Sequence, residues 1–128
     1  MLPYCILIKK MTIREMQIVY EKLKTADVLV IASPVYFYGI SAQLKAIIDR
    51  LHTPMRNEFP IKKLALILVG AATLPELFDS IKIQYRLILN FFRLEDAGMV
   101  LVQGAKDKGD VKKTDGLDKA YELGLFIE

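Results

Sequence analysis

The residues best suited to hold a ligand gather in one loop, Ser33 to Gly39, with the sequence Ser-Pro-Val-Tyr-Phe-Tyr-Gly. The loop follows a short β-branched apolar run, Val28 to Ala32, which predicts a strand buried on both faces. Pro34 should end this strand because it has no N–H to donate to a sheet. In open α/β sheets ligands bind just past the carboxyl ends of the strands, so the candidate site comprises Val35, Tyr36, Phe37, Tyr38 and Gly39.

Outside the Ser33 to Gly39 loop, no group of residues has the spacing of a known catalytic site. The sequence has no Ser/His/Asp arrangement, phosphate-binding Walker loop, metal-ligand cluster or paired-carboxylate motif. His52, the single histidine, has no evident partner and is assigned no role. Lys45 and Asp49 are four residues apart on a predicted helix, which favours a surface ion pair over catalysis. We therefore predict no catalytic side chain and no metal site, and any chemistry would come from a cofactor.

The elements around the loop alternate between helices and strands. Ser41 is a good N-cap for a helix over Ala42 to Leu51, and Thr12 and Glu15 have capping-box spacing for a helix over Thr12 to Lys24. Tyr4 to Ile8 is either a short strand or an extended lead-in. A second strand is expected over Leu64 to Val69.

The second half of the chain continues this alternation. Thr73 and Glu76 have capping-box spacing, and Pro75 fits a first turn, so a helix is expected from there to about Leu94. Gly98 is interpreted as a stop signal before a third strand, Met99 to Val102. A charged loop and a final helix over Thr114 to Phe126 follow. Right-handed crossovers then give a parallel sheet with helices on both faces, an α/β fold in three layers.

Composition limits the class of protein. The 128 residues predict one domain, and 53% hydrophobic content is enough for a sizeable core. Cys5, the single cysteine, excludes an intrachain disulfide and fits a reducing cytosol, so the expected location is cytoplasmic. No signal peptide and no apolar run long enough to span a membrane are evident. A net charge of +3 is too weak to indicate a nucleic-acid partner.

One segment carries a family resemblance. The stretch SPVYFYGISAQLKAIIDR resembles the second cofactor loop and following helix of NADPH-dependent FMN reductase-like proteins, especially their iron–sulfur flavoprotein branch. The similarity covers roughly Cys5 to Glu128. It implies a flavodoxin-like fold and an FMN site. It also implies that the three predicted strands correspond to the third, fourth and fifth of that fold, in a single shortened domain over residues 1–128 that lacks the first two.

The resemblance also shows which parts this sequence lacks. Family members cradle the FMN phosphate in a Ser/Gly-rich loop after their first strand, and that loop is absent here. Hydrogen bonds to a charged phosphate contribute about 1.5–3 kcal/mol each. Losing three or four would cost roughly 5 kcal/mol, or more than three decades of affinity. FMN binding is therefore expected to be weak or absent. Cys5 alone cannot hold an iron–sulfur cluster, so none is expected.

By resemblance, the cofactor-binding residues lie in the loops after the first two strands of this chain. They are Ser33, Pro34, Val35, Tyr36, Phe37, Tyr38, Gly39, Gly70 and Ala71. The three aromatic rings would stack against the flavin, and the small residues would allow its pyrimidine edge to approach. The alternatives are an aromatic patch buried in an oligomer interface and a plain strand-to-helix turn.

Two functions remain open at this stage. One is an FMN-binding, NAD(P)H-dependent oxidoreductase that passes electrons to a quinone or another small acceptor. The other is a non-catalytic, truncated flavoprotein relative that acts as an oligomeric scaffold or weak ligand-binding module. The strand over Val28 to Ala32 would lie at a sheet edge, which invites pairing with another chain. We therefore expect a homodimer or tetramer, through that edge or the aromatic loop, with a nicotinamide nucleotide as a candidate ligand.

Overall fold

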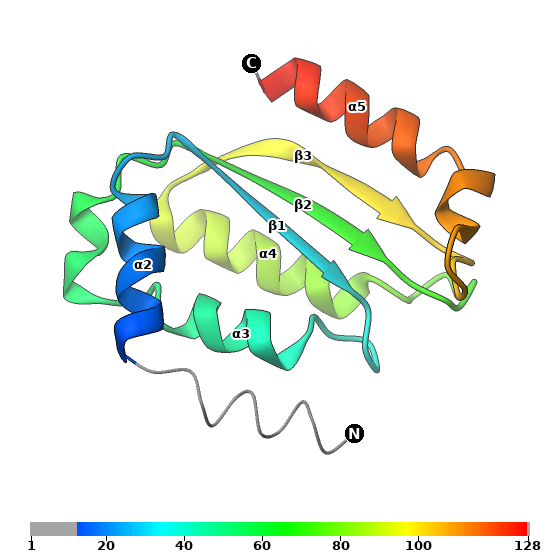
Figure 1. The fold of residues 1–128 in the computed structure, drawn as a ribbon, viewed down its shortest axis with the longest axis horizontal. Coiled ribbons are helices and arrows are strands. Elements are labelled where there is room, and N and C mark those ends of the chain that lie inside the picture. Colours follow the sequence, from blue (N-terminus) through cyan, green and yellow to red (C-terminus); the bar gives the residue numbers. More distant parts are fainter. Residues whose placement is uncertain (1–12, 128) are drawn as a thin grey trace.

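The computed structural model describes residues 13–127, in which helices and strands alternate as predicted. The predicted Tyr4 to Ile8 strand and the Thr12 cap lie outside these residues. The elements in chain order are α2 (Ile13–Leu23), β1 (Val28–Pro34), α3 (Ala42–Asp49), η1 (Pro54–Glu58), β2 (Lys63–Val69), α4 (Asp79–Phe92), β3 (Glu95–Val102), η2 (Asp110–Lys113) and α5 (Gly116–Ile127). Figure 1 labels the strands and the α-helices.

The three strands form one parallel sheet in the order β1-β2-β3. Ile31 of β1 lies opposite Leu66 of β2, which lies opposite Met99 of β3. Because β2 is paired on both sides, its side chains are the most deeply buried, and Leu64, Leu66 and Leu68 are almost inaccessible to solvent. Within the described residues, β1 pairs only with β2 and lies at one end of the sheet.

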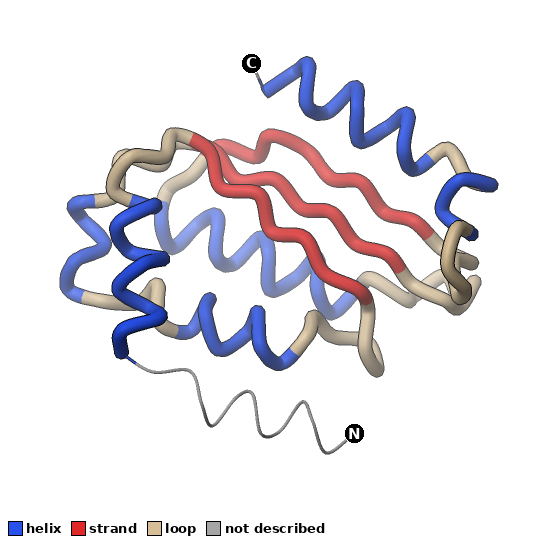
Figure 2. Tube along the Cα trace, in the orientation of Figure 1, coloured by secondary structure: helices blue, strands red, loops and turns tan. Residues whose placement is uncertain are grey.

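Helices cover both faces of this sheet, so the predicted three-layer α/β arrangement is confirmed. Figures 1 and 2 show α3 and α4 on one face and α5 on the other. The core lies between the sheet and α4, where Ile81, Tyr85 and Leu89 pack against the β2 leucines. On the opposite face α5 packs on β3. Val30 of β1 stays 45% exposed there, so the prediction that this strand is buried on both faces was wrong.

Helix α4 begins at Asp79, not near Thr73, so the predicted start was wrong. Residues 75–78 form a turn in which the Leu77 N–H bonds to the Leu74 carbonyl at 3.2 Å. Leu77 and the N-cap residue Phe78 are buried, and Phe78 makes no side-chain cap hydrogen bond. Burial of these two side chains takes precedence over the local capping preference of Thr73 and Glu76.

Gly98 lies inside a strand and does not end an element, which corrects the predicted stop. β3 begins at Glu95, and its pairing with β2 shifts by one residue where Asp96 and Gly98 lie opposite Leu64 and Ala65. This is a β-bulge, and glycine fits it because φ at Gly98 is +125°. Helix α4 ends instead at its C-cap residue, Arg93, whose backbone adopts the left-handed helical conformation.

A buried tyrosine links helix α4 to the sheet. The Tyr85 hydroxyl lies 2.6 Å from the Leu64 carbonyl oxygen and 2.9 Å from Asp96 Oδ1. Asp96 Oδ1 also accepts the Gly98 N–H at 2.9 Å, so one carboxylate accepts hydrogen bonds from both the bulge and helix α4. Burial, the hydrogen bond to Asp96 and its negative charge all raise the pKa of Tyr85 well above its usual value.

We expect Tyr85→Phe to lower the free energy of unfolding by about 1–3 kcal/mol, because the buried Leu64 carbonyl loses the hydroxyl that donates to it. Urea denaturation measures this, and Tyr121→Phe is the control because the Tyr121 ring is exposed. A loss no larger than that of the control would contradict the role given to the hydroxyl.

The raised pKa of Tyr85 also predicts a pH dependence of stability. Above the ordinary pKa of 10.0 the unfolded chain gives up the tyrosine proton while the folded protein keeps it. The stabilisation is therefore present below that pH and lost as the pH rises through the folded pKa. Between about pH 9 and about pH 11, wild type should lose more stability than Tyr85→Phe. Equal losses would contradict this prediction.

Candidate functional site

The loop after β1 is closed by a buried serine. Ser33 is 6% exposed, and its hydroxyl donates to the Pro34 carbonyl at 2.7 Å and accepts the Ser41 N–H at 2.9 Å. Ser41 in turn accepts the Leu44 N–H at 3.3 Å, which confirms it as the N-cap of α3. The end of the strand and the start of the helix are thus tied together, and the residues between them project as one loop.

Tyr36 to Gly39 form a tight turn at the tip of this loop. The Tyr36 N–H bonds to the Gly39 carbonyl at 2.8 Å, and the Gly39 N–H bonds to the Tyr36 carbonyl at 3.1 Å. Phe37 and Tyr38 have φ angles of 46° and 66°, the sign pattern of a type I′ turn. Gly39 closes this tight turn, but the left-handed positions fall on the two aromatic residues.

This conformation is unfavourable for bulky side chains and costs on the order of 1–3 kcal/mol per residue. The loop gains little from burial in return, because Phe37 is 97% exposed and Tyr36 and Tyr38 are also exposed. The Phe37 and Tyr38 rings contact each other edge to face at 5.7 Å. Strain of this kind concentrates at functional sites, so the turn is the strongest candidate for a binding surface among the described residues.

The second predicted loop lies beside the first. Val35 donates its N–H to the Val69 carbonyl at 2.8 Å, and Gly70 donates to the Val102 carbonyl at 2.8 Å. Gly70 is buried, and a Cβ atom there would come within 2.6 Å of Leu77 Cδ2 and 3.6 Å of Val35 Cβ. A side chain at this position would therefore displace Leu77, while the neighbouring Ala71 is exposed.

The loop after β3 completes this edge of the sheet. The Ala105 N–H bonds to the Gly70 carbonyl at 3.1 Å. Farther along, Asp110 Oδ2 accepts the N–H groups of Asp107 at 2.8 Å and Lys106 at 3.1 Å. These bonds and the Lys113 ammonium lower the pKa of Asp110. The structure thus brings the Ser33–Gly39 loop and Gly70–Ala71 together, with the charged loop beside them.

Backbone donors are available at this rim. The N–H groups of Phe37, Tyr38 and Ala71 make no hydrogen bond to any residue within 13–127. Ser80, which the sequence did not single out, donates its hydroxyl to the Tyr38 carbonyl and so holds the turn against the start of α4. No local pattern around Ser80 indicates this contact, because it joins residues 42 positions apart.

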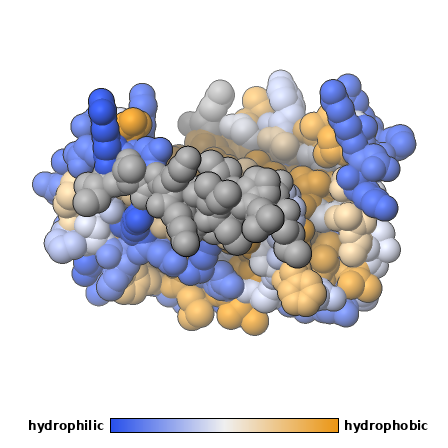
Figure 3. All heavy atoms as spheres, turned by 60° about the horizontal axis from the view of Figure 1, so that its bottom comes forward, coloured by the Kyte–Doolittle hydropathy of each residue, from blue (hydrophilic) through white to orange (hydrophobic). Residues whose placement is uncertain are grey.

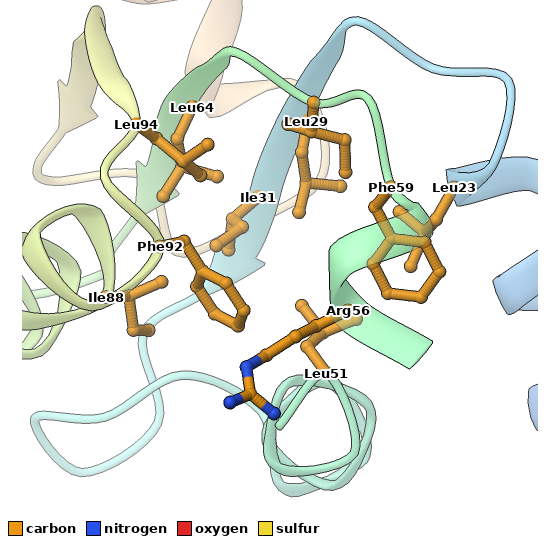
Figure 4. A pocket seen from close by; sticks show the side chains of 11 residues that line it. Leu23, Leu29, Ile31, Leu51, Arg56, Phe59, Leu64, Ile88, Phe92 and Leu94 are labelled. Carbon is orange, nitrogen blue, oxygen red and sulfur yellow. The ribbon is translucent and has the colours of Figure 1, made fainter. Parts of the chain in front are cut away.

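A small apolar pocket lies at the other end of the sheet. It has a volume of about 70 Å³ and is lined mainly by apolar side chains at the beginnings of the strands, including Leu29, Leu64 and Leu94. Figure 4 shows Phe92 and Phe59 on its walls and the Arg56 side chain crossing it. Its small volume excludes a nucleotide-sized ligand from this pocket.

Two further observations concern the predicted absences. Among residues 13–127, no group of three or more His, Cys, Asp or Glu side chains could hold a metal ion. Cys5 lies outside that range. No helix in the same part of the chain is long and apolar enough to cross a membrane. Lys45 and Asp49 form the predicted ion pair on α3.

The geometry agrees with comparisons of the whole sequence. The NADPH-dependent FMN reductase family profile matches residues 2–105. The chain belongs to this family. It is 32% identical over 125 residues to an iron-sulfur flavoprotein of Methanocaldococcus jannaschii, covering 85% of this chain and 61% of that protein. This member of the NADPH-dependent FMN reductase family therefore spans less than two thirds of that relative's length.

Solved structures confirm the flavodoxin-like fold. The Trp repressor binding protein from Bacillus subtilis superposes with a TM-score of 0.74 at 24% identity, over 85% of this chain and 70% of that one. An NAD(P)H:quinone oxidoreductase from Methanothermobacter marburgensis gives a TM-score of 0.68 at 19% identity, over 90% and 63% of the two chains. The expected family and fold are thus both confirmed.

Phe37→Gly should raise the free energy of unfolding by about 0.5–1 kcal/mol, because glycine relieves the left-handed strain and little buried contact is lost. Phe126→Gly is the matched control, since Phe126 is also exposed but lies within α5, where glycine should destabilise. Thermal and urea unfolding would measure both. A destabilised Phe37→Gly protein would mean that the ring supports the fold.

Proposed function

We propose that the chain binds FMN through its ring system at the aromatic turn and acts as an NAD(P)H-dependent oxidoreductase. The observation that carries this proposal is the strained, exposed turn at Phe37 and Tyr38, placed at the carboxyl end of a parallel sheet. Membership of the NADPH-dependent FMN reductase family supports the choice of FMN as the ligand. The single cysteine supports a reducing, cytoplasmic setting for this activity.

The residues of the turn would bind and orient the flavin. The rings of Tyr36, Phe37 and Tyr38 offer apolar surface for stacking. The free N–H groups of Phe37, Tyr38 and Ala71 could donate to the oxygen and nitrogen atoms of the flavin. Bound flavin would supply hydride acceptance from a nicotinamide nucleotide and electron transfer to a quinone or another small acceptor. In this scheme no side chain acts as an acid or base.

The described residues offer little to the FMN phosphate. Helix α4 begins near the turn, but its first turn carries Asp79, whose negative charge opposes an anion there. The Ser80 hydroxyl is already bonded to the Tyr38 carbonyl, and the Ser41 hydroxyl caps α3. Ring contacts would therefore carry most of the affinity, and we propose weak binding with a dissociation constant in the micromolar range or above.

This scheme predicts that FMN and riboflavin bind with similar affinity, within about three-fold, because the phosphate adds little. Titration of flavin fluorescence measures both constants. Phe37→Ala and Tyr36→Ala should weaken binding about 3- to 10-fold through lost stacking. Tyr121→Ala, which removes an exposed ring on α5, should have no effect.

The outcome of the flavin titration distinguishes the oxidoreductase proposal from its alternatives. Binding of FMN hundreds of times tighter than riboflavin would mean that groups outside residues 13–127 hold the phosphate. No saturable quenching at millimolar flavin would overturn the oxidoreductase proposal. It would instead favour a non-catalytic relative that acts as a scaffold or weak ligand-binding module.

A further inference from the structure

The small apolar pocket at the amino ends of the strands contains one charged group. Its volume is about 70 Å³, and its walls come from α2, β1, β2, α4 and the segment around η1. Within residues 13–127, Arg56 is the only charged residue that lines it. Figure 4 shows the apolar side chains of β1 and β2 on one side of the pocket and Arg56 across the opposite side. The pocket therefore combines a hydrocarbon interior with a single cation.

Arg56 is held in place without being neutralised. It is half-buried, and its Nη1 donates to the Thr53 carbonyl at 3.0 Å. The central carbon of its guanidinium lies 5.7 Å from the centre of the Phe91 ring. No carboxylate within residues 13–127 pairs with Arg56, and Glu58 of the same short helix pairs with Lys24 at 3.5 Å. A half-buried guanidinium without a counter-charge favours an anion beside it.

The chemistry of this group selects the kind of anion. A guanidinium presents five N–H groups in one plane, and a carboxylate accepts two of them side by side. The Thr53 carbonyl takes one of these donors, so the others remain for a ligand. A phosphate dianion would bring a second charge that no other lining residue among 13–127 matches. A monocarboxylate therefore fits the single cation best.

The volume of the pocket limits the apolar part of the ligand. A cavity of about 150 Å³ accommodates benzene, which has six carbon atoms. At the same volume per carbon, this pocket accommodates about three carbons and excludes a phenyl ring. On the face shown in Figure 3, side chains at the end of the molecule that contains α2 (left) are mostly hydrophilic. A ligand that approaches through this surface needs a polar end as well as an apolar tail.

We propose that this pocket binds a short-chain aliphatic monocarboxylate, of which butyrate is the representative. The carboxylate would accept hydrogen bonds from the Arg56 guanidinium, and the three-carbon tail would lie between the strands and Phe92. The pocket lies at the opposite end of the sheet from the aromatic turn. The proposal is therefore independent of flavin binding, and either one can fail without the other.

Affinity should follow the length of the tail. Each methylene removed from water should tighten binding about four-fold, so butyrate should bind about 15-fold more tightly than acetate. Valerate and hexanoate should gain nothing more, because about three carbons fill the pocket. Butan-1-ol, which lacks the charge, should bind at least about 10-fold more weakly than butyrate. Butylammonium should not bind, because the Arg56 guanidinium repels it.

Nuclear magnetic resonance of the ¹⁵N-labelled chain, without flavin, tests the proposal directly. Sodium butyrate is the probe, and sodium chloride keeps the ionic strength constant. We expect a dissociation constant on the order of 1 mM. The backbone amide signals of Leu29, Leu64 and Leu94 should shift and saturate, while those of the turn from Tyr36 to Gly39 should not. The acid series on wild type needs no variant to fold.

Two variants separate the cation from the cavity. Arg56→Met keeps an apolar stem without the charge, so it should weaken butyrate binding at least about 10-fold and remove the preference over butan-1-ol. Arg86→Met is the matched control, because Arg86 is exposed on α4 and does not line the pocket. Ile88→Phe keeps the cation but fills the pocket, so it should abolish the dependence on tail length. Circular dichroism should show all three variants folded.

Three results would overturn the proposal. The first is the absence of saturable shifts at about 50 mM butyrate, far above the expected dissociation constant. The second is an affinity that changes neither with tail length nor in Arg56→Met, which would indicate general anion binding at the surface. The third is a set of shifts confined to the aromatic turn or to α5, which would place the carboxylate outside this pocket.

Discussion

The parallel pairing of three strands is the constraint on which the rest of this structure depends. Parallel strands need long crossovers, so α3 with η1 follows β1 and α4 follows β2 before the next strand begins. The same pairing brings the carboxyl ends of all three strands to one edge. The loops that follow them are therefore neighbours, although they lie some 35 residues apart in sequence. The candidate site is a product of topology more than of any local motif.

Much of this architecture can be predicted from the sequence because its strongest signals are local. The runs around Ile31 and Leu66 are continuous and β-branched or leucine-rich, and both form strands, although β1 is buried on one face only. Ser41 stands immediately before an amphipathic stretch and caps α3 through its own side chain. These signals need only neighbours a few residues away, so they persist in the folded protein.

The features that could not be predicted depend on distant partners. The late start of α4 follows from burial of Leu77 against Gly70, and the early start of β3 depends on a bulge bonded to Asp96. In the candidate site, glycine is the residue that would be expected to adopt a positive φ angle. The closing bonds around Ser33 and the contact from Ser80 instead place the left-handed angles on aromatic residues. Tertiary contacts override local preference in each case.

Among residues 13–127, strand β1 pairs with another strand on one side only, and this affects how the protein behaves at high concentration. The strand VLVIASP carries no charge, and its outer row of N–H and C=O groups has no partner among residues 13–127. Such a segment is a template for cross-β growth, and Pro34 interrupts it only at its last position. Fibril formation, not simple reversible melting, is therefore the expected end of heating at high concentration.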